Sequence, residues 1–152
     1  MTSISITGIG VISSVGIGRQ AFWEGCCRAR SGIKPVHAFD TSAYRSNVAA
    51  SVADFRPAKF MSPMTYRRMS PVSRMAVAAS IEAVEDSGLH LDALESDRVA
   101  IIMGTAYGSS SHVDQFYLSL LKDGPRGAQP LLFPETVPNA PARPNPIAST
   151  LK

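Results

Sequence analysis

The sequence predicts an α/β fold, in which strands and helices alternate along the chain. Apolar stretches of strand length occur three times, and each precedes a segment with helical spacing of apolar residues. The apolar fraction of 45% and the charged fraction of 18% are typical of a folded globular protein. The length of 152 residues suits a single domain with its own hydrophobic core.

The first strand is expected over residues 4–12, which are rich in isoleucine and valine. Gly8 and Gly10 in this stretch favour a tight turn. They also resemble the start of a dinucleotide-binding fingerprint, but position 13 is a serine where a third glycine is required. We therefore expect no nucleotide site. The first helix is expected over residues 18–28 and is followed by a turn.

A second strand is expected over residues 47–52, although its alanines favour strands only weakly. The helix after it has the clearest boundaries in the chain. Ser70 suits the N-cap, Pro71 suits the first helical position, and Gly88 suits the end. Many alanines lie on this helix, so we expect it to pack closely against a sheet or another helix.

The third strand is expected over residues 98–103, a continuous apolar run of the kind that is buried on both faces of a sheet. Residues 113–121 then show the spacing of a third helix. Prolines dominate from residue 124 onward, which predicts an extended or poorly ordered segment.

Composition argues against several classes of function. A net charge of +3 is too small for a nucleic-acid-binding surface, so we expect no nucleic-acid partner. No apolar run approaches the length of a membrane span, and the first residues do not resemble a signal peptide, so we expect a cytoplasmic protein without membrane contact. Cys26 and Cys27 are adjacent, and the three histidines are scattered, so we expect neither a disulfide nor a metal site.

Seven short motifs follow one another along the chain in the order of a known family. They are residues 7–16 (TGIGVISSVG), 22–25 with 31–33 (FWEG and SGI), 39–42 (FDTS), 67–70 (RRMS), 83–89 (AVEDSGL), 99–105 (VAIIMGT) and 133–142 (FPETVPNAPA). Together they make the sequence similar to the β-ketoacyl-acyl-carrier-protein synthases from residue 3 to about residue 142. Each motif alone is modest, but seven in order are specific.

The resemblance implies a thiolase-like half-domain over residues 1–142, a mixed sheet with packed helices that is incomplete relative to the full family fold. Residues 143–152 depart from the family pattern and form an atypical proline-rich tail. The family implies a homodimer, or a heterodimer with a synthase-like chain. Half of a layered fold leaves apolar surface uncovered, so we also expect the isolated chain to self-associate.

The family reaction is a decarboxylative Claisen condensation of an acyl thioester with malonyl-acyl-carrier protein, in fatty acid or polyketide synthesis. It needs no cofactor, because the substrates are carried on the phosphopantetheine of acyl carrier protein. The resemblance places the nucleophilic cysteine and both catalytic histidines beyond residue 152, so we expect no catalytic residue here and an inactive isolated chain. We expect Cys26 and Cys27 to be ordinary thiols.

The resemblance also assigns candidate binding residues. Arg67 and Arg68 match the positions of basic contacts to acyl carrier protein, and Arg74 extends this patch. An ordinary solvated helix start is the alternative. Tyr107 and Phe133 match the acyl pocket, where the phenol of Tyr107 would narrow the tunnel. The alternatives are a loop tyrosine that packs on its own helix and a phenylalanine that anchors the core or a subunit interface.

Three interpretations of the whole chain remain open. The chain is part of a condensing enzyme, a non-catalytic module for carrier docking or dimerisation, or a truncated gene product.

Overall fold

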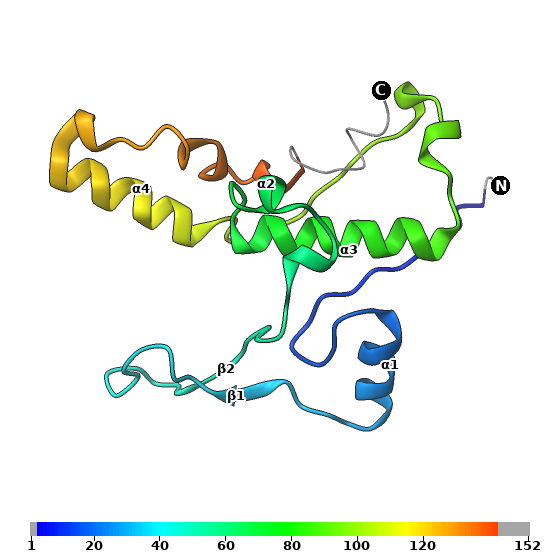
Figure 1. The fold of residues 1–152 in the computed structure, drawn as a ribbon. Helices are drawn as coiled ribbons and strands as arrows, with labels where there is room; N and C mark the ends of the chain where they lie inside the picture. The colour runs from blue at the N-terminus through cyan, green and yellow to red at the C-terminus, as the bar shows by residue number, and fades with distance from the viewer. Residues whose placement is uncertain (1–2, 143–152) are drawn as a thin grey trace.

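The computed structural model describes residues 3–142, apart from the side chains of residues 92 and 96 (Figure 1). The proline-rich tail expected at 143–152 lies outside the described residues. The long helix α3 (Pro71–Ser87) runs through the middle of the molecule, and the other elements lie around it. Its boundaries confirm the sequence prediction. The Ser70 hydroxyl accepts the N–H of Ser73 at 3.2 Å, and Gly88 ends the helix in the left-handed conformation.

The core is small and lies against α3. The short helix α2 (Pro63–Tyr66) and the 3₁₀ turn η1 (Pro57–Lys59) contribute to it, and η1 contacts both α2 and α3. Four residues form its buried centre: Met61, Met69, Val77 and Ala78. Partly buried side chains surround them, namely Ile12, Phe55, Phe60, Tyr66 and Ile81.

The expected first strand is wrong for the chain as it stands. Residues 3–11 run irregularly past α3, and within the described part of the chain the pairing here is a single bridge between Ile12 and Ile17. Gly8 and Gly10 do not make a tight turn. They lie where this segment crosses α3 so closely that a side chain would meet the helix backbone. The helix α1 (Arg19–Cys27) follows, as predicted.

The only sheet among the described residues is a two-stranded antiparallel hairpin. Strand β1 (Ile33–Pro35) pairs with β2 (Val48–Ala50), with Ile33 opposite Ala50. Strand β2 confirms the expected second strand over a shorter range, whereas β1 was not expected. All residues of both strands are exposed, and the hairpin extends away from α3 (Figure 1).

The expected buried strand at residues 98–103 is also wrong. A 3₁₀ turn η2 (Leu91–Ala93) and another, η3 (Ser96–Arg98), lead into an irregular stretch in which Ile102 is 93% exposed. A strand requires a neighbour to pair with its N–H and C=O groups, and no described residue pairs with this stretch.

The last part of the described chain returns to the body. Helix α4 (Ser110–Asp123) confirms the third predicted helix. The proline-rich segment after it is neither extended nor without structure, because it forms three 3₁₀ turns: η4 (Gly124–Gly127), η5 (Phe133–Glu135) and η6 (Ala140–Ala142). The first two contact α4 and the third contacts α3. No helix of the described residues is long and apolar enough to cross a membrane.

Candidate functional site

Arg67 and Arg68 lie together between two helices. Arg67 is the C-cap of α2, and its N–H donates to the carbonyl oxygen of Pro63 at 3.2 Å. Both arginine side chains are exposed. The next residue, Met69, is only 2% exposed and anchors the pair to the core. The positions predicted from the sequence are therefore available at the surface.

Arg74 differs from the pair because its side chain contacts another residue of the chain, Tyr66. Its Nε donates to the carbonyl oxygen of Tyr66 at 2.9 Å, and its guanidinium carbon lies 5.7 Å from the centroid of the Tyr66 ring. These contacts join the first turns of α3 to the end of α2. The charge of Arg74 thus lies beside the pair, on a side chain that also has a structural role.

The stretch around the pair contains cations and no acidic residue. Residues 55–81 contain no aspartate or glutamate, whereas they contain five basic residues: Arg56, Lys59, Arg67, Arg68 and Arg74. Because η1 contacts α2 and α3, Lys59 belongs to the same region as the pair. Sequence reasoning missed this wider basic region, although counting charges over a window of the sequence reveals it.

A buried carboxylate lies behind the basic region. Glu135 is 5% exposed, and its Oε2 accepts the N–H of Ser70 at 2.9 Å and the hydroxyl of Ser73 at 2.7 Å. The Ser70 hydroxyl also donates to Ser73 Oγ at 2.9 Å. A buried carboxylate needs such donors, and the N-terminus of α3 favours its negative charge. No sequence signal pointed to this cluster, because its two parts are more than 60 residues apart.

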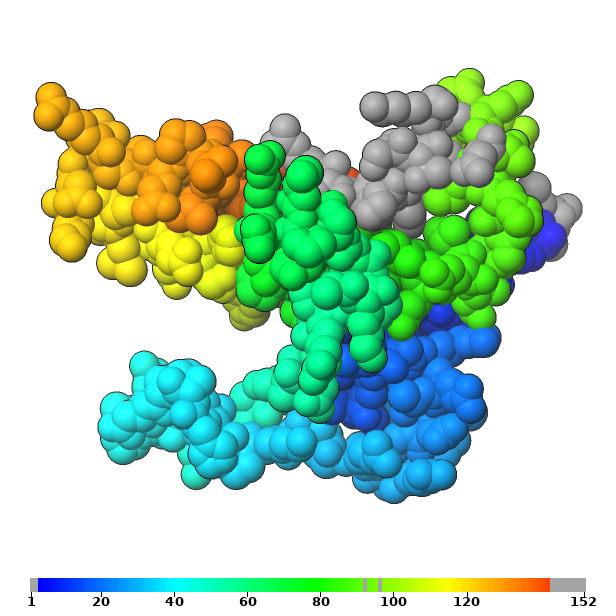
Figure 2. Space-filling view, viewed as in Figure 1, coloured from blue at the N-terminus to red at the C-terminus, as the bar shows by residue number. Residues whose placement is uncertain are grey.

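A pocket of about 410 Å³ opens between α2 and the segment around η5. In Figure 2 the green surface of α2 lies beside the orange surface of that segment. The lining is mostly apolar, with Arg68 and Glu135 as its charged members. Its apolar residues include Met64, Met69, Leu131 and Pro134. The pocket therefore combines an apolar wall with one exposed guanidinium.

The two residues expected at an acyl pocket lie in different surroundings. Tyr107 precedes α4 and is 90% exposed. Phe133 is 58% exposed, and its ring lies 5.8 Å from the ring of Phe116 on α4. The assignment of either residue to an acyl pocket stays a prediction.

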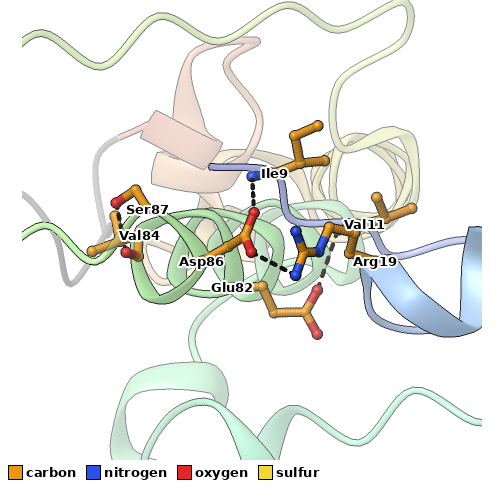
Figure 3. Close-up of polar contacts among 7 residues, drawn as sticks. All are labelled: Ile9, Val11, Arg19, Glu82, Val84, Asp86 and Ser87. Atoms are coloured by element: carbon orange, nitrogen blue, oxygen red, sulfur yellow. Dashed lines mark hydrogen bonds and ion pairs between the residues drawn. The ribbon is translucent and has the colours of Figure 1, made fainter. Parts of the chain in front are cut away.

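A second polar cluster joins the amino-terminal segment to α3 (Figure 3). The N–H of Ile9 donates to Asp86 Oδ2 at 3.0 Å, and the N–H of Val11 donates to Glu82 Oε2 at 3.2 Å. Arg19 forms a 2.8 Å ion pair with Asp86. These carboxylates already bind groups of the chain, so the cluster is structural. Among the described residues, no group of three or more potential ligands could hold a metal ion.

Local hydrogen bonds affect the pKa of Asp40. The N–H of Ser42 donates to Asp40 at 2.9 Å, and this bond, with a second one from the Ser42 hydroxyl at 2.9 Å, lowers the pKa of Asp40 below its ordinary value. Asp40 lies in the loop between β1 and β2, far in sequence from the arginine pair. The bonds define a local turn, and we assign the group no binding role.

Comparison with known proteins settles the family. The model of the β-ketoacyl synthase N-terminal domain matches residues 1–150. The chain belongs to the β-ketoacyl synthase family. This confirms the resemblance found in the sequence motifs.

Two kinds of synthase are similar to this chain. The 3-oxoacyl-[acyl-carrier-protein] synthase 2 of Coxiella burnetii is 32% identical over 136 residues, which cover 90% of this chain and 33% of the relative. The actinorhodin polyketide putative β-ketoacyl synthase 1 of Streptomyces coelicolor is 38% identical over 122 residues, which cover 80% of this chain and 26% of the relative. The chain thus spans about a quarter to a third of the length of these curated relatives.

Solved structures confirm the fold class. The ishigamide ketosynthase/chain length factor superposes with a TM-score of 0.76 and 33% identity, over 90% of this chain and 34% of that one. A type II polyketide ketosynthase, solved in complex with its acyl carrier protein, has a TM-score of 0.72 at 22% identity and supports the fold alone. This β-ketoacyl synthase domain therefore has part of a thiolase-like α/β fold.

Proposed function

We propose that the chain forms the amino-terminal part of an enzyme that condenses an acyl thioester with a malonyl group on acyl carrier protein. Loss of CO₂ from the malonyl group leaves an enolate carbon, which attacks the acyl carbonyl and releases the thiolate that held the acyl chain. The family match over residues 1–150 supports this reaction class. The reaction itself would use a cysteine and two histidines that the family resemblance places outside these 152 residues.

We also propose that this chain binds acyl carrier protein. The observation that carries the proposal is the pair of adjacent exposed guanidinium groups, Arg67 and Arg68, in a stretch without acidic residues. Acyl carrier protein is acidic and its phosphopantetheine arm is anionic, so both would be attracted to this surface. A relative with 32% identity is named a 3-oxoacyl-[acyl-carrier-protein] synthase, which supports a carrier as the partner.

Charge reversal of the pair tests the docking proposal. We expect Arg67→Glu/Arg68→Glu to weaken binding of a bacterial holo acyl carrier protein by about tenfold or more, because attraction becomes repulsion at the edge of the interface. Binding of the original chain should also weaken with added salt. Isothermal titration calorimetry at three salt concentrations measures both effects.

The matched control reverses two other arginines. Arg28 and Arg30 are exposed near the end of α1, which lies apart from α2 in Figure 1. Arg28→Glu/Arg30→Glu changes the net charge equally and should have a much smaller effect. Equal weakening by the two double variants would show attraction to net charge alone. Unchanged affinity in Arg67→Glu/Arg68→Glu would remove the docking role.

The finer assignments of partner and pocket belong to the same proposal. We propose that the enzyme pairs with a second synthase-like chain, which is supported by similarity to a ketosynthase/chain length factor. We also propose that Tyr107 narrows the acyl pocket and that Phe133 contributes to its wall, since both side chains keep exposed surface that another segment can contact. Two free, exposed cysteines suit a reducing compartment, so we place the enzyme in the cytoplasm.

A further inference from the structure

Glu135 joins two distant segments at the base of the basic region. It lies in η5, and its partners Ser70 and Ser73 lie at the N-terminus of α3. A single oxygen, Oε2, accepts both hydrogen bonds, at 2.9 Å from the Ser70 nitrogen and 2.7 Å from Ser73 Oγ. Because all three residues are buried, water cannot easily replace Glu135 as the acceptor. The carboxylate therefore fixes where residue 70 lies relative to η5.

The arginine pair depends on this connection. Ser70 is separated from Arg68 by one residue, the buried Met69. On the other side of the pair, α2 has only four residues and none of them is fully buried, so it provides little rigidity of its own. The backbone of the pair is thus held after Arg68 by the burial of Met69 and the bond from Ser70 to Glu135, and before Arg67 by the bond from Arg74 to Tyr66.

Glu135 also relates the pair to the pocket. Arg68 and Glu135 line the same 410 Å³ pocket, and Leu131 and Pro134 contribute to its apolar lining. Pro134 is the residue immediately before Glu135. Movement of Glu135 would therefore change where the apolar lining lies relative to Arg68.

We propose that Glu135 is a positioning residue for carrier docking. It is too deeply buried to meet a partner protein, and it acts by holding the backbone of Arg67 and Arg68 in a fixed position against η5. Both guanidinium groups then face the carrier from one rigid surface. This inference rests on the proposed docking function.

The test compares substitutions that remove and retain the acceptor. We expect Glu135→Ala to weaken holo acyl carrier protein binding by about fivefold to tenfold and to reduce the salt dependence of Kd. The reason is that Arg67 and Arg68 would no longer contact the carrier at the same time. Glu135→Gln retains an oxygen that can accept both bonds and should stay within about twofold of the original affinity. Ser73→Ala removes one of the two bonds to Glu135, together with the bond that Ser73 Oγ accepts from Ser70, and should give an intermediate loss. Glu85→Ala removes an exposed carboxylate from the last turns of α3 and serves as the control.

The measurements distinguish a positioning role of Glu135 from a loss of folded protein and from failure of the docking proposal. A loss of binding sites per chain with unchanged Kd and salt dependence would mean that Glu135 only maintains the fold, and would overturn the inference. Unchanged binding in Glu135→Ala, together with a clear loss in Arg67→Glu/Arg68→Glu, would also overturn it while leaving the docking function intact. No effect of either substitution would overturn both.

Discussion

At the scale of single residues, the contact between the amino-terminal segment and α3 depends on two glycines, Gly8 and Gly10, which have no side chain. A Cβ atom on Gly10 would collide with the carbonyl oxygen of Ala79, and one on Gly8 would collide with that of Ala83. The facing helix residues are themselves small. The close approach brings the N–H groups of Ile9 and Val11 to the carboxylates of α3, as Figure 3 shows.

We expect Gly10→Ala to destabilise the chain by roughly 1–3 kcal/mol, because the segment must move away from the rigid backbone of α3. Urea unfolding followed by circular dichroism measures the change. Gly104→Ala is the matched control, because no atom lies within 4 Å of its added Cβ and its φ is not in the left-handed region. Equal effects of the two substitutions would contradict the close crossing.

At the scale of elements, α3 is a helix whose two ends are predicted by the local sequence. Its cap, its first-turn proline and its terminal glycine all match the sequence prediction. The hydrogen bonds of a helix join residues four apart, so a short stretch of sequence contains most of the information. The expected strands at 4–12 and 98–103 lack this advantage, because their partners must come from elsewhere in the chain.

The end of α3 provides a test at this scale. Gly88 has a φ of 67° and no atom within 4 Å of an added Cβ, so substitution affects only the backbone. We expect Gly88→Ala to cost about 1–2 kcal/mol, and Gly88→Asn to cost less because asparagine tolerates the left-handed conformation. Denaturant unfolding of the three proteins provides the comparison. Equal stability of the alanine and asparagine variants would contradict this cause.

At the scale of the whole molecule, the chain has an open shape with much apolar surface. It exposes 11344 Å², whereas a compact monomer of 16.2 kDa exposes about 7,500 Å². Figure 2 shows the hairpin separated from the α4 region by open space. Several large apolar side chains are almost fully exposed, among them Ile4, Ile6 and Ile102. Such surface favours association.

We therefore expect the 152-residue chain to self-associate in a concentration-dependent manner. Ile6→Lys/Ile102→Lys should reduce the association measured by sedimentation velocity, because each lysine places a charge on the apolar surface. Ser5→Lys/Ala100→Lys adds the same charge at neighbouring exposed positions and should have less effect. A chain that remains monomeric at all concentrations would contradict the prediction.

The sequence by itself determined the features that depend on neighbouring residues or on motif order. These are the three longer helices, the N-cap at Ser70, the left-handed end at Gly88, and membership of the β-ketoacyl synthase family. It also identified Arg67 and Arg68 as candidate docking residues, and the structure places both at the surface.

Only the tertiary structure decided which distant groups meet. It showed that Gly8 and Gly10 permit a close crossing, that β1 pairs with β2, and that Glu135 binds Ser70 and Ser73. It also showed that residues 99–103 are not paired with any described strand. The physical reason is the same in each case. Strand pairing, close packing and buried hydrogen bonds depend on partners far away in sequence, and local patterns do not specify those partners.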